Sequence, residues 1–158
     1  MVSNIFIDQV LSKISQDFVG TFSCDRIPIE RLLKKKKFCI IVNLSENDFP
    51  GTHYIAIKKT VREVLYFDSG GMKAFISEIC DFLKKIKRSQ RVKLWQNTTK
   101  IQDDSSLFCS FYTMMFCLKG KAMMKIQFSK KNLLSNDETV IHALEKEITK
   151  KSKVKSPS

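Results

Sequence analysis

The spacing of hydrophobic residues changes several times along the chain, and each change predicts a different element. Apolar residues at positions 7, 10, 11 and 14 recur at helical spacing, which predicts a short amphipathic helix followed by a break at Gly20. Pro28 suits the first turn of a second short helix, which we expect to end in the lysine run 34–37.

The next part of the chain has the pattern of a β-sheet. Segments 38–43, 53–57 and 64–68 are short and rich in β-branched and aromatic residues, and turn residues such as Pro50-Gly51 and Ser69-Gly70-Gly71 separate them. We expect three strands here and a fourth at 92–95, with a helix over 72–87 between them. The sequence therefore predicts a sheet with a crossover helix.

The last third of the chain returns to helical patterns. Residues 105–118 are apolar nearly all round, which predicts a helix buried in the centre of the molecule. Ser135 and Glu138 have capping-box spacing before the apolar stripe of a final helix. We expect a single domain over residues 1–150 and a disordered basic tail over 151–158.

Composition excludes several classes of protein. Of the 158 residues, 43% are hydrophobic, so the chain can bury enough apolar surface to fold. It has no run of 18 apolar residues and no secretory signal, and its five cysteines include no CxxC pair. We therefore expect a protein of a reducing compartment, with neither a disulfide framework nor a metal site.

The net charge of +12 is concentrated in the second half of the chain. Residues 1–80 hold 11 basic and 9 acidic side chains, whereas residues 81–158 hold 17 and 7. Such an excess indicates an anionic partner, with nucleic acid as the first candidate and a membrane surface as the second, although lysines that only keep the domain soluble would look the same. The densest basic run, which we predict to bind nucleic acid, is Lys84, Lys85, Lys87, Arg88, Arg91 and Lys93.

Three polar residues stand at element ends where they can meet. His53 begins one predicted strand, Asp68 ends the next, and Cys109 lies near the start of the buried helix. An antiparallel pair of strands would place His53 beside Asp68, and a helix N-terminus with an adjacent imidazolium favours the nucleophilic thiolate. Gln102, in the loop before Cys109, can supply a side-chain amide to an oxyanion. Taken singly, each has a structural interpretation, since a buried cysteine is usually a small hydrophobe.

The ordered set resembles a known family. The order His, Asp, Gln, Cys is similar to that of adenain, the adenovirus protease, and of the SUMO-deconjugating proteases, especially the adenain-type proteases of Polinton/Maverick elements and related DNA viruses. The resemblance covers residues 18–118. Its motifs are Phe18-Val19-Gly20-Thr21-Phe22, Asp25-Arg26-Ile27-Pro28, Cys39-Ile40-Ile41-Val42-Asn43, Pro50-Gly51-Thr52-His53-Tyr54-Ile55-Ala56, Tyr66-Phe67-Asp68-Ser69-Gly70-Gly71 and Gln102-Asp103-Asp104-Ser105-Ser106-Leu107-Phe108-Cys109.

The resemblance implies an α+β fold in which a central mixed sheet packs against a buried helix that carries the nucleophile. It implies Cys109 as nucleophile, His53 as general base, Asp68 as the orienting carboxylate and Gln102 as the oxyanion amide. Two residues depart from the family pattern: Tyr54 stands where Trp is usual, and Ser110 where Gly is usual. The substrate-binding residues implied are Gly51, Thr52, Tyr54 and Ser110.

The function implied is that of a cysteine endopeptidase of an adenovirus-like or Polinton-like DNA element, which cleaves capsid or core precursors beside small residues, Gly especially. We expect a monomer in the virion, the host nucleus or a reducing compartment, with no membrane association and no required cofactor. The resemblance implies two candidate activators, which are DNA bound without sequence preference and an activating peptide. Two alternatives stay open: a protease that removes a ubiquitin-like protein ending in Gly-Gly, and a degenerate basic module that binds nucleic acid or a capsid.

Overall fold

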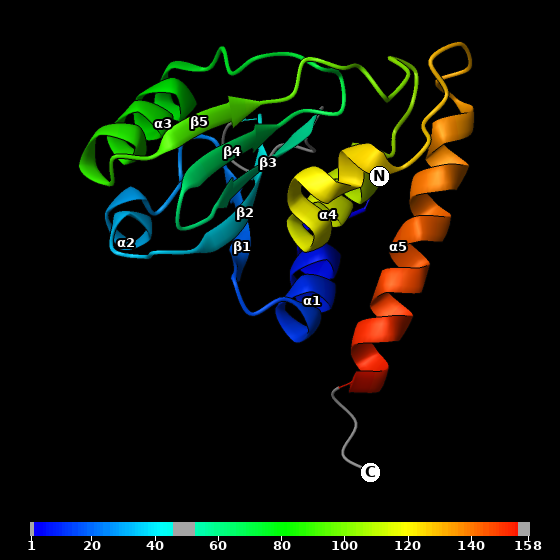
Figure 1. Cartoon of the computed structure of the whole chain (residues 1–158), viewed down its shortest axis with the longest axis horizontal. Coiled ribbons are helices and arrows are strands. Elements are labelled where there is room, and N and C mark those ends of the chain that lie inside the picture. The colour runs from blue at the N-terminus through cyan, green and yellow to red at the C-terminus, as the bar shows by residue number, and fades with distance from the viewer. Residues whose placement is uncertain (1, 46–52, 155–158) are drawn as a thin grey trace.

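A five-stranded mixed β-sheet forms the centre of the computed structural model, which describes residues 2–45 and 53–154 (Figure 1). The strands lie in chain order: β1 (Phe18–Ser23), β2 (Phe38–Asn43), β3 (Tyr54–Lys59), β4 (Glu63–Phe67) and β5 (Lys93–Gln96). The two outer pairs, β1 with β2 and β4 with β5, are parallel, and the two inner pairs are antiparallel. The predicted mixed sheet is confirmed.

Helices cover both faces of this sheet (Figure 1). On one face lie α2 (Ile29–Leu33) and α3 (Ser77–Ser89). On the other lie α1 (Asn4–Ile14), α4 (Cys109–Lys119) and α5 (Ser135–Val154), with a 3-10 turn, η1 (Gly120–Lys125), after α4. Because both faces are covered, all six residues of β2 are buried, which explains why its first five residues are all hydrophobic.

Helix α4 is the central helix, as its all-round apolar pattern predicts. It packs against β3 and is itself covered by α1 and α5. The Phe116 ring stacks on the Phe67 ring of β4, with 4.5 Å between centroids, and on the Trp95 ring of β5 at 5.9 Å. These contacts hold α4, which begins at Cys109, against β4 and β5. Asp68 directly follows β4, and the loop that contains Gln102 follows β5.

Several predicted boundaries were wrong. The segment around Gly20 is strand β1 rather than a break, because Gly20 sits at a register shift where its φ of +154° accommodates a bulge. Helix α3 begins at Ser77 rather than at 72, and α4 begins at Cys109 rather than at 105. Helix α2 ends at Leu33, before the lysine run.

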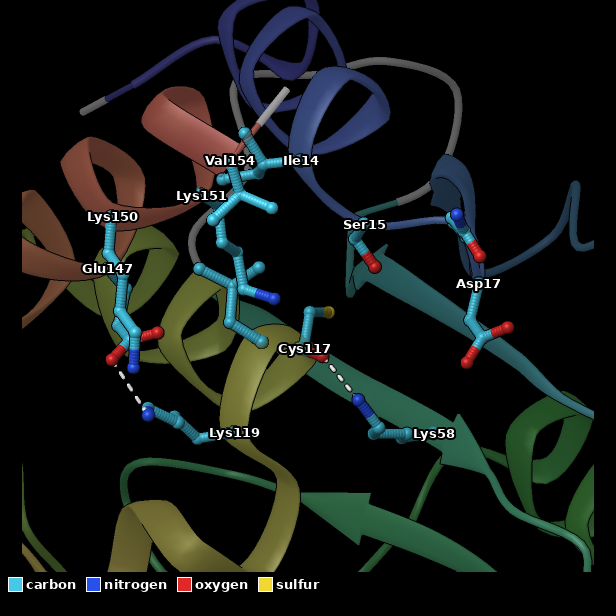
Figure 2. Close-up of a pocket in the computed structure, with 12 residues that line it drawn as sticks. Ile14, Ser15, Asp17, Lys58, Cys117, Lys119, Glu147, Lys150, Lys151 and Val154 are labelled. Atoms are coloured by element: carbon cyan, nitrogen blue, oxygen red, sulfur yellow. Dashed lines mark hydrogen bonds and ion pairs between the residues drawn. The ribbon is translucent and has the colours of Figure 1, made fainter. Parts of the chain in front are cut away.

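The C-terminal helix α5 continues to Val154, so residues 151–154 are helical where the sequence predicted the start of a disordered tail. Basic residues in its last turn suit a helix C-terminus. Figure 2 shows the pocket where this end of α5 meets the ends of α1 and α4, with Lys119 paired to Glu147 at 2.7 Å and Lys58 donating to the Cys117 carbonyl. Within the described residues, no helix has the length and apolarity needed to cross a bilayer.

Candidate active site

Strand ends bring His53 and Asp68 together. His53 immediately precedes β3 and Asp68 immediately follows β4, and because these strands are antiparallel the start of one lies beside the end of the other. The His53 Nε2 atom lies 2.9 Å from the Asp68 Oδ1 atom. Asp68 is only 1% exposed, whereas the His53 side chain is 29% exposed. The imidazole thus has a buried carboxylate behind it and an open side.

The buried side chain of Asn97 holds the backbone of Asp68. Its Oδ1 accepts from the Asp68 N–H at 2.8 Å, and its Nδ2 donates to the Asp68 carbonyl at 2.6 Å. The Asp68 carboxylate also accepts from the Gly70 N–H at 2.7 Å. Sequence analysis missed Asn97; the available signal was a polar residue directly after a strand that neighbours β4.

Cys109 is the first residue of α4, so its side chain stands at the helix N-terminus. It is 2% exposed, and its thiol lies close enough to the His53 side chain to raise the pKa of that imidazole. Because Nε2 faces Asp68, Nδ1 is the ring nitrogen left for the thiol. All five cysteines are free, and burial raises the pKa of Cys117, at the other end of α4, as suits a structural residue.

The environment keeps His53 protonated at neutral pH. Burial acts to lower its pKa, but hydrogen bonds and charge from Asp68 and Cys109 outweigh burial and raise the pKa of His53 from 6.5 to about 9. An imidazolium beside a thiol favours the thiolate, the nucleophilic form of cysteine. The geometry of Cys109, His53 and Asp68 is therefore that of an activated nucleophile.

Gln102 is buried in the loop before α4 and is tied to the residue after Asp68. The Ile101 and Gln102 N–H groups both donate to the Ser69 carbonyl, at 2.9 and 3.1 Å, and the Ser69 hydroxyl donates to Gln102 Oε1. The Gln102 Nε2 atom donates to the carbonyl and hydroxyl oxygens of Ser106, at 3.1 and 3.0 Å. The amide is thus fixed at both ends, with its N–H groups directed to Ser106.

Of the four residues expected to bind substrate, the structure describes Tyr54 and Ser110, and both are buried. Tyr54 is buried and donates its hydroxyl to Asn4 of α1 at 2.7 Å. Ser110 is fully buried, and within residues 2–45 and 53–154 its Oγ has no hydrogen-bond partner. Both side chains point into the packing around α4, and their role in substrate binding stays a prediction. Gly51 and Thr52 lie outside the described residues.

An apolar hollow that the sequence analysis did not identify lies beside Cys109. Leu107 and Phe108, which directly precede Cys109, line it together with Phe111 and Leu134. Leu107 and Leu134 are more than half exposed. The available signal was apolar residues in a loop just before a helix.

The basic run predicted to bind nucleic acid is fully on the surface. Every one of its six side chains is exposed, on α3, in the turn that follows it and at the start of β5. Lys85 pairs with Glu30 at 3.2 Å, and Lys84 lies 3.9 Å from Asp81. Because α3 covers the face of the sheet opposite to α4, this surface is separate from Cys109 (Figure 1). No three His, Cys, Asp or Glu side chains in the described part of the chain form a metal-binding group.

The comparisons with known proteins identify the fold class. No family model matches the chain, and no curated protein does. The ASFV pS273R protease aligns with 74% of the chain at a TM-score of 0.57 and 16% identity. The SUMO protease Ulp1, solved with its catalytic cysteine oxidised to a sulfinic acid, aligns with 93% at a TM-score of 0.54 and 13% identity. The chain has the α+β fold of these cysteine proteases.

The extent of the match differs between the two neighbours. The chain spans 56% of the length of the pS273R protease and 78% of that of Ulp1. A second crystal structure of pS273R, with selenomethionine, gives a TM-score of 0.54 at 18% identity. At these identities the comparison establishes the fold, and the activity of this chain has to be argued from its own residues.

Proposed function

We propose that this chain is a cysteine endopeptidase. The observation that supports it most directly is the cluster of Asp68, His53 and Cys109, in which Asp68 is hydrogen-bonded to His53 and Cys109 acts on the pKa of the same imidazole, built on the fold of known cysteine proteases. As the finer proposal, we assign it to an adenovirus-like or Polinton-like DNA element, in which it cleaves capsid or core precursors beside small residues. The likeness to a viral protease is consistent with that assignment.

The proposed reaction is acyl transfer in two steps. The Cys109 thiolate attacks the scissile carbonyl carbon, and His53 gives its proton to the departing amine as the C–N bond breaks. Water then loses a proton to His53 and attacks the thioester, which releases the acid and restores the Cys109 thiolate beside protonated His53. Asp68 keeps the ring of His53 in one orientation throughout.

The oxyanion in each step needs fixed donors. The first-turn N–H groups of a helix have no partner within the helix, so the Cys109 N–H is available to the carbonyl oxygen. Gln102 supplies the second donor in this proposal, once substrate competes with Ser106 for an amide hydrogen. The apolar hollow lined by Leu107 and Phe108 offers a contact for a substrate side chain.

Cleavage of peptides that contain Gly-Gly tests this proposal. The wild-type chain should cleave them, and Cys109→Ala should lose at least about 1,000-fold in kcat/KM because the nucleophile is gone. Iodoacetamide should label Cys109 selectively, and the labelling rate should fall in His53→Ala. Cys80→Ala, which removes a partly exposed thiol away from the site, is the matched control and should change neither rate.

Equal cleavage by wild type and Cys109→Ala would overturn the protease assignment. Slow labelling of Cys109 that does not depend on His53, with no cleavage, would instead support the degenerate basic module.

A second substrate class is favoured by the extent of the match to Ulp1, which is described as a SUMO protease. The alternative proposal is that this chain removes a ubiquitin-like protein ending in Gly-Gly. A folded ubiquitin-like fusion and a short Gly-Gly peptide separate the two proposals. Preference for the fusion by more than about 100-fold in kcat/KM would identify a deconjugating enzyme, and equal rates would identify an endopeptidase.

We also propose that the exposed basic run on α3 and β5 binds DNA without sequence preference. Its support is the concentration of positive side chains on one surface away from Cys109. A DNA molecule bound there would leave the face carrying Cys109 open to a protein substrate.

A further inference from the structure

The start of α5 is linked to the Gln102 loop by buried hydrogen bonds. Asp137, in the first turn of α5 and 8% exposed, accepts from the Ser106 hydroxyl at 2.9 Å through its Oδ1 atom. The same oxygen accepts from the Tyr112 hydroxyl of α4 at 2.9 Å. The neighbouring Asn136 donates to the Ile101 carbonyl at 2.8 Å. Two residues of α5 therefore contact the loop on either side of Gln102.

The donors and acceptors in this series have a fixed direction. A carboxylate can only accept, so Asp137 takes the single hydrogen of the Ser106 hydroxyl. With that hydrogen used, the Ser106 oxygen can only accept, and it accepts from Gln102 Nε2. At the other end of the amide, the Ser69 hydroxyl donates to Oε1. The carboxylate of Asp137 therefore adds to the Ser106 carbonyl, which also accepts from Gln102 Nε2 at 3.1 Å, in holding the N–H end of the amide toward Ser106.

We propose that Asp137 is a positioning residue for the active site, which acts through Ser106 to keep the N–H end of the Gln102 amide toward the segment leading to Cys109. This inference rests on the proposed protease function and extends it to the C-terminal helix. A rotated amide would place its oxygen, an acceptor, where the carbonyl oxygen of the substrate needs a donor.

Asp137→Asn is the sharpest test, because it keeps the shape of the side chain but introduces an N–H₂ group that can donate to Ser106. We expect kcat on a Gly-Gly peptide to fall about 10-fold or more with little change in KM, since transition-state stabilisation is lost. The rate of Cys109 alkylation should stay within twofold of wild type, because His53 and Asp68 are untouched. Tyr112→Phe removes the other hydrogen bond to the same carboxylate oxygen and is the matched control; it should keep kcat within twofold.

A double-mutant cycle shows whether Asp137 acts through Ser106. In a Ser106→Ala background, Asp137→Asn should produce no further loss of kcat. Provided that the wild type is active, full activity of Asp137→Asn would overturn the proposal. An equal loss of kcat on adding Asp137→Asn to the wild type and to Ser106→Ala would overturn it as well. An inactive wild type would instead refute the protease function itself, and slowed alkylation with a lowered Tm in Asp137→Asn would show that the residue is only structural.

Discussion

The hydrogen bond between His53 and Asp68 controls the protonation state of the site. Burial alone would lower the pKa of His53, so the rise to about 9 depends on its two hydrogen-bond partners. We expect Asp68→Asn to lower the pKa of His53 from about 9, because burial is then opposed by Cys109 alone. Alkylation of Cys109 at pH 7 should slow at least about 10-fold.

The same pKa shift makes stability depend on pH. Since the folded pKa lies above the ordinary value, the stabilisation from protonated His53 is complete below pH 6.5 and is lost as the pH rises through about 9. Urea unfolding between pH 6 and 10 should show this loss in wild type and a smaller loss in Asp68→Asn. Asp81→Asn, an exposed carboxylate on α3, is the control and should retain the wild-type profile; a wild-type profile in Asp68→Asn would contradict this account.

The sequence predicted the candidate site residues themselves but not the residues that hold them in place. His53, Asp68 and Cys109 stand at element ends, Gln102 lies in the loop before α4, and their order is one that a known family shares. The structure brings His53 close to both Asp68 and Cys109. The partners that hold them were not predictable, because they are distant in sequence. Asn97 lies 29 residues from Asp68, and Asp137 lies 31 residues from Ser106.

At the scale of elements, α4 connects Cys109 to the sheet through aromatic packing. Phe116 is fully buried between Phe67 and Trp95, so Phe116→Ala removes a large side chain that the surroundings cannot replace. We expect the free energy of unfolding to fall by about 3–5 kcal/mol, measured by chemical denaturation. Phe75→Ala, at a 60% exposed phenylalanine, should change it by less than about 0.5 kcal/mol. A loss below about 1 kcal/mol in Phe116→Ala would show that α4 is loosely packed.

Hydrophobic periodicity predicted the elements that are buried either on one face or on all sides, because burial determines which of their positions are apolar. Strand β2 and the helix α4 are examples, since both are buried on all sides. The pattern failed at β1, where a glycine bulge interrupts the alternation, and at the start of α4, where apolar Leu107 and Phe108 extend the helical pattern into the preceding loop. Local spacing does not distinguish a buried turn of helix from an apolar loop that faces solvent.

At the scale of the whole molecule, the sheet separates two surfaces. The face bearing α1, α4 and α5 contains Cys109 and the Gln102 loop, and the face bearing α2 and α3 carries the basic run (Figure 1). Exposed cations on one surface favour phosphate binding that is sensitive to salt and carries no base specificity. DNA binding and peptide cleavage should therefore be separable by mutation.

A triple variant tests this separation by combining Lys87→Glu, Arg88→Glu and Lys93→Glu. All three side chains are exposed, so the fold should persist while DNA affinity falls, and the slope of log K against log salt should decrease by about one for each phosphate that the protein no longer neutralises. Fluorescence anisotropy with two unrelated duplexes measures both effects, and cleavage of a peptide in the absence of DNA should be unchanged. Replacing Lys146, Lys150 and Lys153 of α5 by Glu alters the net charge equally on another surface. If DNA binds the α3 surface, only the α3 and β5 variant should lose affinity. An equal loss of affinity in both variants would show that the net charge, and not the α3 surface, attracts DNA.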